Sequence, residues 1–137
     1  MNRARHALIE LPERVDARGA LTFAQEGDHF PFAVKRFFAI YGVPESASRG
    51  GHAHRGQHQF LVMLQGKMAV TVDDGAVRSV VTLDRPNLAL YAPPMLWLEL
   101  DKISAGGICL VLTSDVYSEA DYIRDRPEFL RLAAAAQ

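Results

Sequence analysis

The stretch MAVTVDDG, residues 68–75, decides the fold class of this chain. Apolar residues alternate with small or polar ones through its first six positions, which is the two-residue period of a strand with one face in a core. Asp74-Gly75 ends the run, and glycine accepts the positive φ that a tight hairpin turn demands. The stretch therefore predicts a β-strand that leads into a hairpin.

Apolar and β-branched runs of the same kind recur at short intervals along the chain, separated by turn residues such as Gly, Pro, Asn and Asp. Strands are expected at residues 32–40, 58–64, 67–73, 77–83, 88–92, 96–100 and 108–113. Many short strands at this spacing predict an all-β sandwich or barrel.

The tail of the chain has a different pattern. Residues 118–124 have helical character, with Ser118 as a candidate N-cap. Pro127 interrupts this run and is expected to start a second short helical turn. On such a helix Asp121 and Arg124 would form a solvated pair.

Composition limits the classes of protein to which the chain can belong. Its 137 residues are 49% hydrophobic, which suffices for a single domain over residues 1–137. The 15 basic residues balance the 16 acidic ones, so we expect neither nucleic acid nor a membrane as a partner. The chain lacks a membrane-length apolar stretch and a signal core, which indicates a cytoplasmic protein. Its single cysteine, Cys109, lies in an apolar run and is expected to be buried and inert.

The densest chemistry lies in RGGHAHRGQHQ, residues 49–59, which holds three of the five histidines. If His52 and His54 lie on a strand, the two-residue period places both side chains on one face. Such a pair can hold a metal ion or carry out acid–base catalysis, and a merely solvated strand start is the third alternative. His58 begins the next expected strand, and its side chain could face away from the pair.

The metal alternative can be tested against the pattern of metal-binding cupins, which follow their His-x-His pair with a glutamate and a later histidine. Here the glutamate positions hold His58 and Gln59, and residues 88–113 contain no histidine. Three neutral imidazoles could still bind zinc, which keeps a metal-dependent cupin oxygenase as an alternative. We favour acid–base chemistry without metal or cofactor, because a neutral histidine near pH 7 is a suitable general base.

Candidate substrate-binding residues surround this run. Arg49 and the amides of the two glycines after it suit an anionic group such as phosphate. Arg36 lies inside an apolar run, so it points either inward to a diphosphate or outward to solvent. Tyr91 and Trp97 lie on late apolar strands, where they either stack on a base or sugar or fill the core.

Two motifs carry a resemblance to a known family: SRGGHAH at residues 48–54 and DVYSEADYIR at residues 115–124. Further similar stretches lie at residues 16–21, 41–44, 73–75 and 91–100. With these motifs the chain resembles the nucleotide-sugar 3,4-ketoisomerases, which are metal-free, WxcM-like cupins. The resemblance covers nearly the whole chain.

The resemblance implies a cupin double-stranded β-helix, or jelly-roll, that forms a homodimer. The implied reaction converts a TDP-4-keto-6-deoxyhexose to the 3-keto sugar through an enediol, in deoxyamino-sugar biosynthesis. His52 matches the catalytic base and His54 its partner. Arg49 matches a residue near the diphosphate, and Arg18 a position that varies with product configuration at C4. A non-catalytic sugar-nucleotide-binding cupin remains an alternative.

The chain departs from the family at Phe37-Phe38, where tyrosines are often found. If a phenol normally orients the substrate there, Tyr41 or Tyr91 must replace it. For the homodimer, the apolar residues 7–11 could add to the edge of a partner's sheet.

Overall fold

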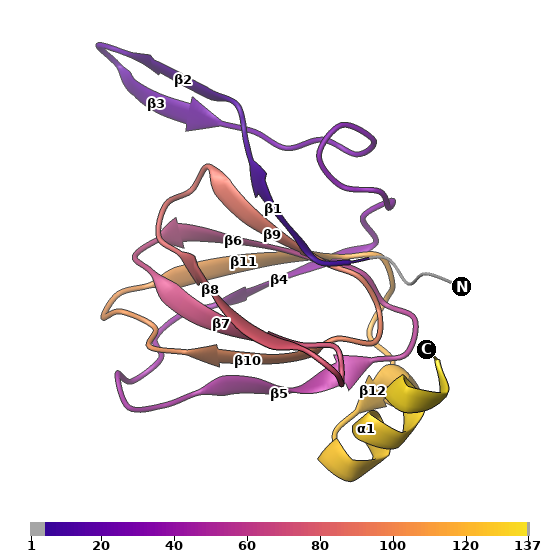
Figure 1. Ribbon diagram of the computed structural model, residues 1–137. Coiled ribbons are helices and arrows are strands. Elements are labelled where there is room, and N and C mark those ends of the chain that lie inside the picture. The colour runs from indigo at the N-terminus through magenta and orange to yellow at the C-terminus, as the bar shows by residue number, and fades with distance from the viewer. Residues whose placement is uncertain (1–4, 137) are drawn as a thin grey trace.

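The computed structural model describes residues 5–136, which fold into two antiparallel sheets, a hairpin and one α-helix (Figure 1). The first sheet contains, in spatial order, β1 (Ala7–Glu10), β9 (Leu88–Ala92), β6 (Gln59–Gln65), β11 (Ile108–Thr113) and β4 (Arg36–Ile40). The second contains β12 (Tyr122–Ile123), β5 (Arg49–His54), β10 (Trp97–Asp101), β7 (Met68–Asp73) and β8 (Arg78–Leu83). The jelly-roll expected from the sequence is confirmed.

The two sheets face one another because each strand turns alternate side chains toward a shared core. On β10, Leu98 and Leu100 point into this core, whereas Trp97 points outward. On β11, Cys109 and Val111 point inward. Burial raises the pKa of the Cys109 thiol to about 12, so this group is protonated and inert at neutral pH.

Other parts of the chain cover the outer faces of the sheets. Helix α1 (Arg126–Ala135) packs on the second sheet, where the rings of Phe129 and Trp97 have centroids 5.5 Å apart. On the first sheet, Phe30 from the segment before β4 packs on Phe60, with centroids 5.0 Å apart. None of the described helices is long and apolar enough to cross a membrane.

A hairpin of β2 (Glu13–Asp16) and β3 (Gly19–Thr22) projects from the barrel, at the end away from α1 (Figure 1). Its apolar side chains Val15 and Leu21 are 70% and 58% exposed. Arg18 lies at its tip. The hairpin therefore presents apolar surface that residues 5–136 leave uncovered.

The tail does not form the helix that was predicted over residues 118–124, so that prediction is wrong. Only Glu119–Asp121 form a short 3-10 turn, and the next two residues pair with β5 as β12. Sheet hydrogen bonds to β5 replace the helical turn that local spacing favoured. Pro127 lies in the first turn of α1, where its missing N–H needs no partner, so it helps to begin a helix.

Candidate active site

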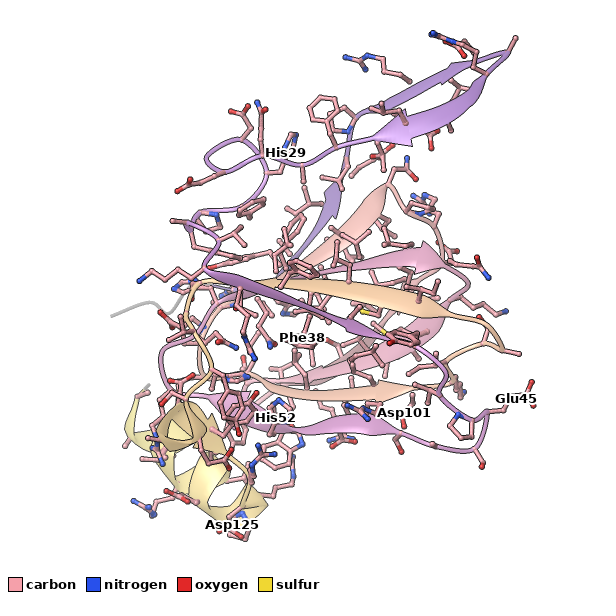
Figure 2. The ribbon with its side chains drawn as sticks, turned by 180° about the vertical axis from the view of Figure 1, so that it is seen from behind. His29, Phe38, Glu45, His52, Asp101 and Asp125 are labelled. Atoms are coloured by element: carbon pink, nitrogen blue, oxygen red, sulfur yellow. The ribbon has the colours of Figure 1, made fainter. Side chains whose placement is uncertain are left out.

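A cavity of about 270 Å³ lies between the two sheets. Its walls come from β4, β6 and β11 on one side and from β5 and β10 on the other, and tail residues also line it. Phe38 and His52 mark these two opposing walls in Figure 2. The interior of the jelly-roll thus carries a small cavity lined by both apolar and polar side chains.

A β-bulge brings Arg49 and His52 to the same face of β5. Three residue steps from Arg49 to His52 match two steps on β10, from Leu100 to Leu98. Gly50-Gly51 absorb the extra residue with φ angles of 85° and 78°. A Cβ at Gly50 would lie 2.8 Å from the Leu98 carbonyl oxygen, so no larger residue fits there. Both side chains therefore line the cavity although they are three residues apart.

His52 presents its imidazole to this cavity. The centroid of its ring lies 5.2 Å from that of His54 and 4.8 Å from that of Tyr122. Burial, followed by the nearby His54 and Arg124, lowers the pKa of His52 to about 4. His52 is consequently neutral at pH 7 and can accept a proton.

His54 lies beside His52 and is only 5% exposed. Its Nδ1 lies 2.9 Å from Oδ2 of Asp121, and its Nε2 lies 3.4 and 3.5 Å from the side-chain nitrogens of Gln57 and Gln59. Burial lowers the pKa of His54, and Asp121 opposes that effect. Gln59 lines the cavity, so it is the member of this group that reaches the cavity wall.

Arg36 points into the cavity from β4, as the inward alternative predicted. Its guanidinium carbon lies 5.1 Å from the ring centroid of Phe38 and 5.6 Å from that of Tyr117. Its Nε and Nη2 atoms are buried and have no hydrogen-bond partner within residues 5–136. Such donors are costly to leave unpaired, so their position suits an anionic ligand.

The tail contributes cavity residues that were not predicted from the sequence. Tyr122 and Arg124 line the cavity, and the guanidinium carbon of Arg124 lies 4.2 Å from the Tyr122 ring centroid. The expected solvated pair of Asp121 and Arg124 is wrong, because Asp121 bonds His54 and Arg124 bonds Glu119 at 2.7 and 2.9 Å. The DVYSEADYIR motif was the available signal, but its helical spacing favours a solvated pair of Asp121 and Arg124.

Four residues predicted to bind substrate lie outside the cavity lining. Arg18 is at the hairpin tip with a side chain 90% exposed, and Tyr41 is 72% exposed beyond β4. Tyr91 packs on the outer face of the first sheet. Trp97 lies beneath α1 and donates a hydrogen bond to Glu99 at 2.9 Å, a position that fits its core alternative.

His58 lies on the opposite face of the first sheet from the cavity. Its Nδ1 lies 2.8 Å from the hydroxyl of Tyr91, and its ring lies 5.8 Å from that of Phe32. His58 therefore cannot join His52 and His54 around one ion. Within residues 5–136, no three His, Cys, Asp or Glu side chains are grouped so as to hold a metal.

The fold is that of a cupin, and its interior cavity is lined by the neutral His52 and by the guanidinium of Arg36. More narrowly, the chain belongs to the FdtA family, described as WxcM-like, C-terminal, whose model matches residues 4–134. The resemblance inferred from the two motifs is confirmed.

Relatives of known activity are similar over nearly the full chain. The TDP-4-oxo-6-deoxy-alpha-D-glucose-3,4-oxoisomerase of Aneurinibacillus thermoaerophilus is 37% identical over 127 residues, covering 93% of this chain and 91% of the relative. A 3,4-ketoisomerase structure from Helicobacter canadensis is 34% identical with a TM-score of 0.92, covering 96% and 99% of the two chains.

QdtA, a sugar 3,4-ketoisomerase of Thermoanaerobacterium thermosaccharolyticum, has been solved with TDP bound. It is 31% identical with a TM-score of 0.92, and 96% of each chain is covered. A histidine-to-asparagine mutant of QdtA has been solved with TDP-4-keto-6-deoxyglucose, also at 31% identity and a TM-score of 0.92, over 95% of this chain and 94% of that one.

Proposed function

We propose that this chain is a sugar 3,4-ketoisomerase that converts a TDP-4-keto-6-deoxyhexose to the TDP-3-keto sugar. The observation that carries the proposal is a neutral histidine, His52, lining a cavity that also holds Arg36, whose buried Nε and Nη2 have no hydrogen-bond partner among the described residues. The names of the relatives, and the TDP and TDP-sugar bound to QdtA, support this substrate class.

The chemistry needs one well-placed base. The C4 ketone acidifies the proton on C3, and His52 removes it to give an enediol between C3 and C4. His52 then returns a proton to C4 while the hydroxyl protons move, which leaves the ketone at C3. C4 is reduced and C3 is oxidised within the same sugar, so the reaction needs no external oxidant or reductant. One imidazole serves both carbons if they present the same face to it.

The anionic end of the substrate would lie against arginines. Arg36 offers buried donors that have no partner in the part of the chain that the structure describes, and Arg49 lines the same cavity from an exposed position at the start of β5. Bidentate contacts from guanidinium groups suit the geometry of a diphosphate. We therefore assign the diphosphate to these two residues and the sugar to the neighbourhood of His52.

Incubation with TDP-4-keto-6-deoxyglucose, followed by NMR, tests the function directly. We expect the 3-keto sugar to form at the same rate before and after dialysis of the enzyme against EDTA, because proton transfer by His52 needs no Lewis acid. TDP binding without product would favour the non-catalytic binding protein. Activity that EDTA abolished and one divalent metal restored would favour a metal-dependent cupin.

We further propose that the protein is a homodimer and that Arg18 acts across it. Arg18 lies at the tip of the hairpin, at the end of the barrel away from β12 and His52 (Figures 1 and 2). Val15 and Leu21 of the hairpin are exposed, and β1 is an edge strand of the first sheet. A second copy would cover these apolar groups and bring Arg18 to a cavity that it cannot reach in its own chain.

Mixed dimers distinguish action across the dimer from action within one chain. In a dimer of Arg18→Ala with His52→Asn, the first subunit keeps His52 and receives Arg18 from its partner. Co-expression of the two variants should therefore give roughly a quarter of the yield of the product that the wild-type enzyme forms. Each variant expressed alone should give a yield well below a quarter. Arg14→Ala on the same hairpin is the matched control. A monomer by light scattering at micromolar concentration, or no recovery in mixed dimers, would contradict the proposal.

A further inference from the structure

Asp121 is held beside His54 by backbone pairing that joins distant parts of the chain. Its backbone oxygen accepts a hydrogen bond from the Arg55 amide at 2.9 Å, and the following residue, Tyr122, pairs with His54. The carboxylate is partly buried, with 22% of the side chain exposed. The backbone contacts with β5 therefore hold Asp121 beside His54.

Both carboxylate oxygens of Asp121 have defined partners. Oδ1 accepts a hydrogen bond from the backbone N–H of Gly56 at 2.7 Å, and Oδ2 lies 2.9 Å from Nδ1 of His54. A carboxylate can only accept, so Nδ1 of His54 must carry the proton. In the neutral ring, Nε2 is then an acceptor.

The partners of Nε2 agree with this assignment. The amide nitrogens of Gln57 and Gln59 approach it at 3.4 and 3.5 Å, and an amide nitrogen can only donate. If Gln59 donates its N–H to His54, its carbonyl oxygen is left to accept a hydrogen bond elsewhere. Because Gln59 lines the cavity on β6, opposite His52, that oxygen is available to a sugar hydroxyl.

We propose that Asp121 is a positioning residue: it fixes His54 as the Nδ1–H tautomer and thereby sets the hydrogen-bonding direction of Gln59 at the cavity wall. The consequence for turnover rests on the proposed isomerase function, whereas the tautomer and the TDP affinity do not. The hydrogen bonds between Asp121 and His54 and between His54 and Gln59 connect the tail with β5 and β5 with β6. This role does not require His54 to touch the substrate.

The substitution Asp121→Asn reverses this arrangement for a geometric reason. The Gly56 N–H requires an oxygen, so the amide oxygen must stay on that side and the amide NH2 must face His54. Nδ1 would then have to accept, and the proton would move to Nε2. Gln57 and Gln59 would have to turn their carbonyl oxygens toward the ring, which inverts what Gln59 presents to the sugar.

The test is ¹⁵N NMR of the histidine rings in the full-length protein, together with kinetics and TDP binding. We expect His54 to be protonated at Nδ1 in the wild type and at Nε2 in Asp121→Asn. We also expect kcat to fall about 10- to 100-fold in the variant, a loss comparable to that for removal of a hydrogen-bond partner of a metal-bound histidine, while the dissociation constant for TDP stays unchanged. A loss of folding would instead weaken TDP binding as well.

Asp125→Asn is the matched control, since it makes the same chemical change at the N-cap of α1, where asparagine caps as well as aspartate. It should leave the His54 tautomer and kcat at wild-type values. Protonation of wild-type His54 at Nε2 would overturn the proposal, and so would wild-type kcat in a variant whose tautomer has inverted. A wild-type protein without turnover would instead refute the isomerase function, and the tautomer measurement would still decide the role of Asp121.

Discussion

Replacement of His52 by asparagine is expected to lower turnover by at least about 100-fold while TDP binding is retained. Asparagine keeps the approximate size of the side chain and its capacity for hydrogen bonds, but it cannot take a proton from C3. His52 is the histidine that lines the cavity, so its loss removes the base and leaves the arginines in place. Steady-state kinetics and calorimetry with TDP measure the two effects separately.

Hydrogen exchange identifies the step that is lost. In deuterium oxide the wild type should place deuterium at C4 of the product, and His52→Asn should fail to exchange the C3 hydrogen of the substrate. His58→Asn is the matched control, because His58 lies on the other face of the sheet, and it should exchange normally. Exchange at the wild-type rate in His52→Asn would remove His52 as the base.

His52 also sets the acid limb of the pH dependence of kcat/KM. Because burial lowers the pKa of His52 to about 4, its neutral form persists well below pH 6.5 in the free enzyme. The acid limb of kcat/KM should therefore lie well below 6.5. A bound diphosphate favours the charged imidazolium, so the limb of kcat should lie at higher pH than that of kcat/KM. A kcat/KM already falling at pH 6.5 would contradict this assignment.

Replacement of Arg36 by methionine should change ligand affinity and stability in opposite directions. Two charge-assisted hydrogen bonds to the diphosphate, about 1.5 kcal/mol each, imply a dissociation constant for TDP raised roughly 150-fold. Without ligand, Nε and Nη2 of Arg36 are buried donors lacking partners in the described chain, so their removal should raise the free energy of unfolding by about 1 to 3 kcal/mol. Calorimetry and urea denaturation measure the two changes.

Lys35→Met is the control for charge, since Lys35 is the exposed neighbour just before β4 and should change neither quantity. Arg49→Ala should raise the dissociation constant only about tenfold, because the exposed guanidinium of Arg49 is already solvated when the ligand is absent. An Arg36→Met protein that was less stable without ligand and bound TDP normally would show that Arg36 serves the fold.

The alternation of apolar residues predicted most strands of the two sheets because it is a local property of each strand. It gave no strand for β2, β3 or β12. It also predicted a strand over residues 32–40, whereas β4 begins at Arg36. Phe32 is apolar because it packs over the outer face of the first sheet together with Phe30, a contact that periodicity along one strand does not reveal.

The site was predictable only where it is local. The shared face of His52 and His54 follows from their spacing, whereas Asp121 is 67 residues from His54 in the chain and meets it only because β12 pairs with β5. Tyr91 and Trp97 belong to the expected strands, but their distance from the cavity depends on which face of each sheet is the inner one. That choice is made by packing of both sheets and α1, which no single stretch encodes.

The bulge at Gly50-Gly51 has a consequence for how this site can change over generations. Point substitutions replace a side chain, but they do not change which positions of a strand face the cavity and which face away from it. An in-frame loss of one of the two glycine codons would remove the bulge and leave Arg49 and His52 two residues apart, which in regular pairing with β10 still places them on one face. The charge and the base can therefore share the cavity at two lengths of this segment, three residues apart with the bulge or two residues apart without it.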